Sequence, residues 1–184
     1  DDWTPRPYSL GELPERLART PGVAAVEDLF QVELGVRAGK VGAKLQIDAQ
    51  EYERLPMKER RLFRPVAETR SIRHGRIQPI TWIFYPDAVM TSAQIQHVAP
   101  TFHKRHLAQL GLADDAKVDL ERARRDTNLA LRPRLVARAF IGPESFAVDA
   151  HGSFVVVQGY SWLPKQPVLD APFETTELLL DYAF

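Results

Sequence analysis

The sequence predicts an α+β fold, with a central mixed or antiparallel sheet and flanking helices. Runs of β-branched and aromatic residues indicate strands in both halves of the 184-residue chain. Helical patterns lie between them without a regular strand–helix–strand alternation, which disfavours a doubly wound parallel sheet. At this length the chain can bury a core of its own, and its apolar fraction of 45% is ordinary for a globular domain.

Capping residues, together with proline and glycine, mark where the helices begin and end. Asp48 is a candidate N-cap, and Thr91 or Ser92 can begin the longest helical stretch. Pro100 interrupts this stretch and Gly111 ends it. Helices are therefore expected at residues 9–19, 49–55, 56–63, 92–110, 114–131 and 174–184.

Strands are expected where β-branched and aromatic residues cluster or alternate with polar ones. The clearest run is TWIFYP at residues 81–86, which has proline at its end and another proline just before it. The turn Ala150-His151-Gly152 lies between two alternating runs and predicts a hairpin. The expected strands cover residues 30–36, 44–47, 81–85, 134–140, 145–149 and 153–163.

The chain is predicted to consist of a helical lead-in, residues 1–25, and one larger domain, residues 26–184. It begins without methionine and ends inside an apolar helical pattern, so we expect it to be part of a longer polypeptide. It has no cysteine, no signal peptide and no apolar run of the roughly 18 residues that cross a bilayer. We therefore expect a cytoplasmic protein without disulfides and without a membrane partner.

Charge is balanced overall but unevenly distributed, with 24 cationic and 24 acidic side chains. Residues 54–76 hold eight cations and two acids, and residues 122–138 hold six cations and one acid. Arginine outnumbers lysine 18 to 6, which is expected where planar guanidinium groups bind phosphate and guanine. Ordinary solvated faces would give the same counts, and this alternative stays open.

A glycine-rich loop with three cations lies between two expected strands, in the sequence FQVELGVRAGKVGAKLQID of residues 30–48. It matches neither G-x-G-x-x-G nor G-x-x-x-x-G-K-[ST], and no helix follows it directly. It is either a hairpin with solvated cations or a loop that contacts a phosphate backbone. In the second case the contacts come from its amides and from Arg37, Lys40 and Lys44.

Three other chemistries have weak support. His97, His103 and His106 lack the further ligand that a zinc site needs, and an exposed basic helix fits them better. The strings PD at residues 86–87 and DAK at residues 115–117 resemble the PD…(D/E)xK arrangement of metal-dependent nucleases, but DAK opens a helical pattern. Acyl transfer has no support, because there is no G-x-S-x-G motif and no cysteine nucleophile.

Several stretches together resemble a known family. They are VEDLFQVELGVRAGKVGAKLQID (residues 26–48), YERLPMKERRLFRPVAETRSIRHGRI (52–77), TWIFYP (81–86), RPRLVARAFIGPESFAVDAHGSFVVVQGYSWLPK (132–165) and TTELLLDYAF (175–184). This order resembles the C-terminal target-recognition region of TaqI-like N6-adenine DNA methyltransferases, which include bifunctional restriction–modification enzymes. The loop departs from the family at Ala38, where Thr or Ser is usual.

The resemblance implies a sequence-specific DNA-binding domain, with a TaqI-like specificity fold, from a restriction–modification or phage-defence system. Its implied partners are double-stranded DNA and the methyltransferase domain of the parent chain. The family's [NDS]-P-P-[FY] motif and S-adenosylmethionine site do not occur here, so we expect no catalysis, no cofactor and no metal in this chain. A protein-interaction or structural module of a larger enzyme and a metal-dependent nuclease remain as alternatives.

DNA contacts are expected where cations lie beside glycine or proline at strand ends, because such loops hold charge toward a ligand. The backbone of Gly35 and Gly39 is expected to approach the DNA. Gln158, Tyr160 and Trp162 are weaker candidates for contacts with base edges or for stacking. The expected cationic contacts are Arg37, Lys40, Lys44, Arg70, Arg73, Arg76, Arg132, Arg134 and Arg138.

Overall fold

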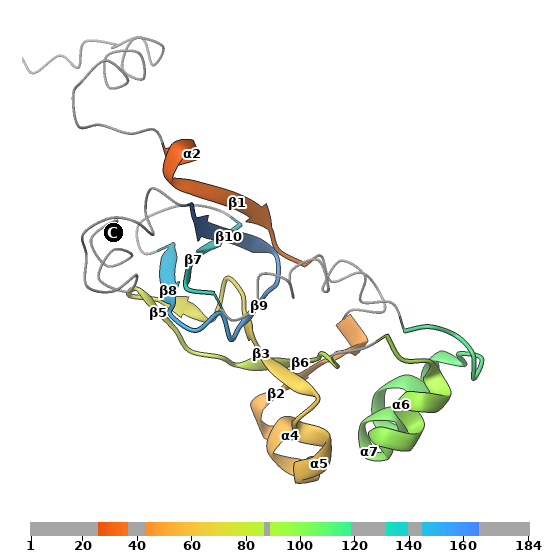
Figure 1. The fold of residues 1–184 in the computed structure, drawn as a ribbon. Coiled ribbons are helices and arrows are strands. Elements are labelled where there is room, and N and C mark those ends of the chain that lie inside the picture. Colours follow the sequence, from red (N-terminus) through yellow and green to blue (C-terminus); the bar gives the residue numbers. More distant parts are fainter. Residues whose placement is uncertain (1–25, 37–42, 87–88, 119–131, 140–144, 166–184) are drawn as a thin grey trace, which may run out of the picture.

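The computed structural model describes residues 26–36, 43–86, 89–118, 132–139 and 145–165. Across these ranges the fold is α+β, as the sequence predicts (Figure 1). The helices expected at residues 9–19 and 174–184, and most of the one at 114–131, lie outside the described residues. No helix in the described ranges is long and apolar enough to span a membrane.

The described elements are short. The strands are β1 (Phe30–Leu34), β2 (Gln46–Asp48), β3 (Phe63–Ala67), β4 (Ile72–Arg73), β5 (Arg76–Ile77), β6 (Thr81–Phe84), β7 (Arg134–Arg138), β8 (Phe146–Asp149), β9 (Val155–Val156) and β10 (Gly159–Pro164). The helices are α2 (Val26–Leu29), α4 (Ala49–Arg54), α5 (Met57–Arg60), α6 (Ser92–Val98), α7 (Pro100–Phe102), the π-helical turn η1 (His103–Leu107) and the 3-10 turn η2 (Ala108–Leu110).

The described strands form two four-stranded sheets and one two-stranded hairpin, not the single central sheet that we expected. Sheet 1 has the order β1-β10-β7-β8 and is antiparallel throughout. Sheet 2 has the order β2-β6-β3-β9 and is mixed, because β3 and β9 run parallel. Figure 1 shows α4 and α5 below sheet 2 and α6 and α7 to its right, with sheet 1 above.

The chain passes from sheet 2 to sheet 1 between β9 and β10, and the backbones are very close at this junction. Gln158 lies there in the left-handed region, with a φ of 53°. The amide of Gly35 donates to the carbonyl of Gly159 at 2.8 Å. A Cβ on Gly35 would lie 2.6 Å from the carbonyl oxygen of Val156, and one on Gly159 would lie 2.4 Å from that of Ala137. Only glycine permits this approach.

The sequence predicts that the strands on the two sides of residues 150–152 pair with each other, and this prediction is wrong. The turn itself forms, because the amide of Gly152 donates to the carbonyl of Asp149 at 3.3 Å. However, β8 pairs with β7, and β9 pairs with β3 in the other sheet. The single strand predicted over residues 153–163 is also divided, into β9 and β10 in different sheets. Alternation specifies which face of a strand is buried and not which strand is its neighbour.

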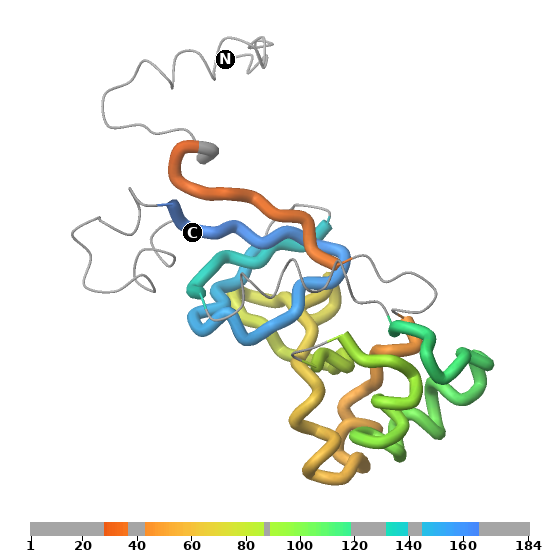
Figure 2. Tube along the Cα trace, turned by 45° about the vertical axis from the view of Figure 1, so that its right-hand side comes forward, coloured from red at the N-terminus to blue at the C-terminus, as the bar shows by residue number. Residues whose placement is uncertain are grey.

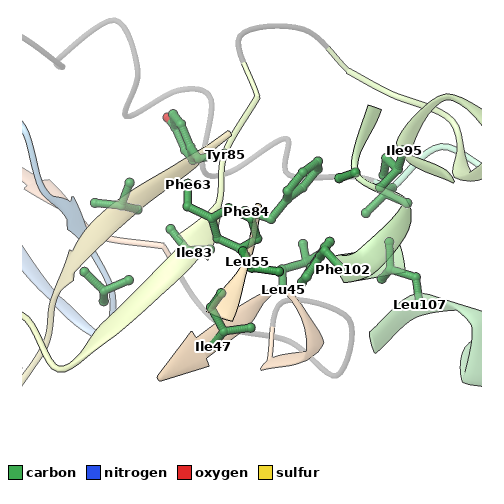
Figure 3. Packing of buried hydrophobic residues seen from close by; sticks show 14 of the residues in the cluster. Leu45, Ile47, Leu55, Phe63, Ile83, Phe84, Tyr85, Ile95, Phe102 and Leu107 are labelled. Atoms are coloured by element: carbon green, nitrogen blue, oxygen red, sulfur yellow. The ribbon is translucent and has the colours of Figure 1, made fainter. Parts of the chain in front are cut away.

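The larger core lies between sheet 2 and the helices around it (Figure 3). Phe63 on β3, Phe84 on β6 and Phe102 on α7 are buried, and their ring centroids lie 5.0 to 5.5 Å apart. Buried aliphatic residues surround this aromatic centre: Leu45, Ile47, Leu55, Ile83, Ile95 and Leu107. A second cluster joins sheet 1, sheet 2 and the hairpin: Ala67, Ile72, Val136, Ala147 and Val156.

The predicted helix signals are confirmed at three positions. Asp48 caps α4 by accepting a backbone amide. Thr91 caps α6, and Gln94 completes the capping box. Gly111, with a φ of 58°, ends the helical stretch in the left-handed conformation. By contrast, residues 114–118 form a turn and a bridged residue where we expected another helix to begin.

Candidate nucleic-acid interface

The candidate site is a short hairpin with its entry segment, residues 70–77, which we call the arginine hairpin. Its strands β4 and β5 are antiparallel and have these partners: Ile72 with Ile77, and Arg73 with Arg76. His74 and Gly75 connect them with φ angles of 49° and 74°. Two successive positive φ angles are typical of the type I′ turn, whose twist matches that of the flanking strands. Glycine adopts this conformation freely, and histidine is among the residues found there most often.

The arginine hairpin is held against both sheets. Ile72 is 1% exposed and packs with Ala67 at the end of β3 and with residues of sheet 1. The guanidinium of Arg138, at the end of β7, donates to the carbonyl of Ile72. A backbone bridge from Gly75 to Ala147 connects the turn with β8. The position of the hairpin is therefore fixed by rigid elements and not by its own two short strands.

The segment before β4 forms a turn that hydrogen bonds between Glu68 and Ser71 stabilise. The hydroxyl of Ser71 accepts from the amide of Glu68 at 2.8 Å and donates to its carbonyl at 2.9 Å. The carboxylate of Glu68 accepts from the hydroxyl of Thr81, on β6, at 2.7 Å. The acid nearest in sequence to the hairpin arginines is thus directed at β6, and in the described ranges it forms no ion pair with them.

The hairpin concentrates positive charge. Arg70, Arg73 and Arg76 are exposed. Within the part of the chain that the structure describes, none of the three has a carboxylate partner. Arg73 and Arg76 are direct cross-strand partners, so their like charges destabilise the pairing unless an anion lies between them. The arrangement suits an oxyanion such as phosphate, to which each guanidinium offers parallel N–H donors.

Three of the predicted contact segments meet at one end of sheet 1. Gly35, where the glycine-rich loop departs, is buried and its amide donates to the carbonyl of Gly159 at the start of β10, so its backbone faces the protein and not DNA, contrary to the prediction. Gln158 is exposed, and its amide donates to the carbonyl of Val36 at 3.1 Å. Gly159 is also the pairing partner of Arg138, whose guanidinium holds the arginine hairpin. The loop entrance and Gln158 are therefore neighbours, and Arg138 connects this end of sheet 1 with the base of the hairpin.

Arg134 does not lie on this surface, contrary to the prediction. It is 2% exposed, and its Nε donates to the carboxylate of Asp149 at 3.2 Å. Its other nitrogens donate to the hydroxyl of Ser161, at 3.3 Å, and to the carbonyl of Phe154. This buried guanidinium joins β7 to both of its neighbours in sheet 1, so its role is structural.

Three further predicted residues are half-buried, and Trp162 and Arg138 make contacts inside the protein. The ring of Trp162 meets those of Phe30 and Phe146 edge-on, at centroid distances of 6.3 and 5.4 Å. Arg138 is half-buried and uses its guanidinium inside the protein. Tyr160 is half-buried two residues before Trp162, on the same face of the sheet. These side chains position the interface more than they form its surface.

The remaining predicted contacts lie apart from the arginine hairpin or outside the described residues. Lys44 is exposed and precedes β2, on the far edge of sheet 2. Arg132 is exposed and precedes β7, at the end opposite Arg138. The contacts expected from the loop at Arg37, Gly39 and Lys40 fall outside the described residues.

The alternative chemistries gain no geometric support. His103 Nε2 lies 3.1 Å from the hydroxyl of Ser92, whereas His106 Nε2 lies 2.8 Å from the carboxylate of Glu51, so the two rings have different partners. Among the described residues, no group of three or more His, Cys, Asp or Glu could hold a metal ion. In the DAK string, Asp115 lies in a turn and Lys117 in an isolated bridge to Thr91, outside the named strands, and the acid of the PD string lies outside the described residues.

Sequence reasoning singled out the arginines but missed the hairpin that carries them. The available signal was the His74-Gly75 pair, because a two-residue turn ending in glycine between apolar residues indicates a hairpin. The flanking strands have only two residues each, which is too short for an alternation to be recognised. Glu68 and Ser71 gave no signal, since their contacts exist only once the segment is folded.

No protein-family model matches this chain, and no curated protein matches it either.

Proposed function

We propose that this chain is the DNA target-recognition domain of a TaqI-like N6-adenine DNA methyltransferase, in a restriction–modification or phage-defence system. The observation that carries DNA binding is the arginine hairpin, whose Arg70, Arg73 and Arg76 are exposed without acidic partners among the described residues. The sequence resemblance supports the choice of family, and the α+β architecture is compatible with it.

The chemistry of the hairpin suits duplex DNA. The major groove of B-form DNA admits a two-stranded β-ribbon. Within it an arginine can bind O6 and N7 of guanine, or it can bind phosphates and so fix the register of the protein. Gln158, exposed at the neighbouring junction, carries the amide that binds adenine in the same groove. One good bidentate contact contributes about 1–3 kcal/mol of discrimination against the wrong base.

In this proposal the chain performs no chemistry of its own. A methyltransferase domain elsewhere in the parent chain would hold S-adenosylmethionine and the flipped adenine. The recognition domain would fix that domain at the correct sequence from the other side of the duplex. The proposed function places the protein in the cytoplasm, together with the DNA.

Binding of the 184-residue chain to fluorescent duplex DNA, measured by anisotropy over a salt series, tests the proposal. Because the target sequence is unknown, the duplexes come from a random pool, and selection followed by sequencing identifies a preferred site. Replacing Arg70, Arg73 and Arg76 together by alanine should weaken binding. It should also flatten the slope of log K against log salt by about 0.9 for each phosphate that the protein no longer neutralises.

A matched control removes three cations from another exposed region. Arg54, Lys58 and Arg61 are exposed on and beside α4 and α5, below sheet 2, and their replacement by alanine changes the net charge by the same amount. We expect this control to keep most of the affinity and the slope. Absence of DNA binding, or an equal loss in both triple variants, would contradict the proposal and favour the protein-interaction alternative.

A further inference from the structure

Among the described strands, β1 forms one edge of sheet 1. The other edge, β8, is joined to the arginine hairpin through the bridge between Gly75 and Ala147. Among the described strands β1 pairs only with β10, and Figure 2 shows the two side by side, with β1 on the outside. Its apolar residues Val32 and Leu34 are 46% and 48% exposed. An exposed edge strand with apolar side chains is a template for pairing with another chain.

The free backbone groups of β1 alternate along the strand. Just before the strand, the carbonyl of Leu29 accepts a hydrogen bond from the amide of Lys165 at 2.8 Å. Just after it, the amide of Gly35 donates to the carbonyl of Gly159, on β10, at 2.8 Å. Because the hydrogen-bonding direction alternates in an antiparallel pair, the odd-numbered residues face β10 and the even-numbered residues face outward. The N–H and C=O groups of residues 30, 32 and 34 therefore point away from the sheet, and no described hydrogen bond reaches them.

We propose that β1 pairs antiparallel with β1 of a second copy of this chain, about a two-fold axis at Val32. This register puts Val32 opposite its own copy and Phe30 opposite Leu34, so the three residues with outward backbone groups pair with one another. It also puts Gln31 opposite Glu33, an amide beside a carboxylate. Their chemistry is compatible, since Gln31 already donates to Glu33 within the strand at 2.6 Å.

Other registers fit less well. An axis at Glu33 would oppose two carboxylates, which is destabilising. An axis at Gln31 would leave Leu34 without a partner across the interface. An axis between two residues would match outward backbone groups with groups that already bond to β10. Of these registers only the one with its axis at Val32 is self-complementary, and this self-complementarity favours a second copy over an unrelated partner.

The pairing is expected to be weak. A five-residue strand provides far less contact than the roughly 800 Å² per partner of a standard stable interface. Association should therefore depend on protein concentration and reach a dimer only in concentrated solution. This inference does not rest on DNA binding, because the arginine hairpin lies at the other edge of sheet 1.

Analytical ultracentrifugation of the 184-residue chain over a concentration series tests the register. Val32→Lys and Val32→Glu each place like charges across the axis, so each variant alone should stay monomeric where the unmodified chain dimerises. Their equimolar mixture places opposite charges there and should restore the dimer. Val98 is also apolar and 37% exposed but lies on α6, so Val98→Lys and Val98→Glu should each behave like the unmodified chain. Circular dichroism checks that each variant is folded.

Amide hydrogen exchange provides a second readout that does not depend on any substitution. Protection at Val32 and Leu34 should rise with concentration, whereas protection at Gln31 and Glu33 should stay the same, because those amides already bond to β10. A monomeric unmodified chain at every concentration would overturn the proposal. Dimers of Val32→Lys alone, or a mixture of the two charged variants that stays monomeric, would overturn it as well.

Discussion

Arg134 and Arg73 carry the same charge and both lie in strands, yet their partners give them opposite roles. Arg134 lies across from Asp149, whose carboxylate also accepts from the amide of Ser153 at 3.0 Å. Arg73 lies across from Arg76, and both side chains are exposed. A sequence pattern shows the charge of a strand residue, but the residue opposite it comes from a distant segment.

We expect Asp149→Ala to lower the free energy of unfolding by about 3–5 kcal/mol, because it leaves a buried guanidinium without its counter-charge. Arg134→Met should cost less, since the remaining carboxylate keeps its backbone donors at Ser153 and Phe154. Urea unfolding measures both costs. Arg134→Met should also leave the salt slope of DNA binding unchanged. If the salt dependence of DNA binding became weaker in that variant, Arg134 would be a DNA contact after all.

Gly159→Ala should destabilise the fold through a backbone clash. The new Cβ would lie 2.4 Å from the carbonyl oxygen of Ala137, which β7 holds in place. We expect a loss of roughly 1–3 kcal/mol in urea unfolding, as is typical for inserting an atom into a packed interior. Gly111→Ala is the control, because there a Cβ has open space and only the φ of 58° is unfavourable. If Gly159→Ala lowered the free energy of unfolding by no more than Gly111→Ala does, the backbone at the junction would be able to move and avoid the clash.

At the scale of elements, the arginine hairpin combines unfavourable pairing with exposed charge. Arg73→Glu replaces a repulsive cross-strand pair by an attractive one, so it should stabilise the fold by about 0.2–1 kcal/mol. The same change should weaken DNA binding, because it introduces a negative charge next to the phosphates. Thermal unfolding measures the expected gain in stability, and anisotropy of labelled DNA measures the expected loss of affinity. If stability and affinity fell together, the arginines would serve the fold and not a ligand.

Elements defined by local chemistry could be predicted, and those defined by distant partners could not. The caps at Asp48 and Thr91 and the stop at Gly111 follow from nearby atoms, so the sequence identified them. The division into two sheets depends on β9, which takes β3 as a parallel partner about ninety residues earlier in the chain. The arginine hairpin had a local turn signal at His74-Gly75 but strands too short to show an alternation, and its position depends on the distant Arg138 and β8.

At the scale of the whole molecule, backbone bonds connect the two sheets where they meet. The amide of Val36, just after β1, donates to the carbonyl of Val156 on β9 at 2.8 Å. The amide of Val157 donates to the carbonyl of Ala67 at the end of β3, at 2.9 Å. The strand that leaves sheet 2 continues into sheet 1 within three residues, so loss of one sheet removes pairing partners from the other.

This connection predicts that the two sheets unfold together. Trp82 lies in sheet 2, stacked on Tyr52 at 4.8 Å, and Trp162 lies in sheet 1. One chain with Trp3 and Trp162 replaced by phenylalanine, and one with Trp3 and Trp82 replaced, each retain a single reporter tryptophan. Because each replacement shifts stability by itself, each chain is followed by both fluorescence and far-ultraviolet circular dichroism. Within each chain the two urea transitions should coincide, as required for one cooperative unit. If the Trp162 signal changed before the circular dichroism, sheet 1 would unfold on its own and the junction would be a hinge.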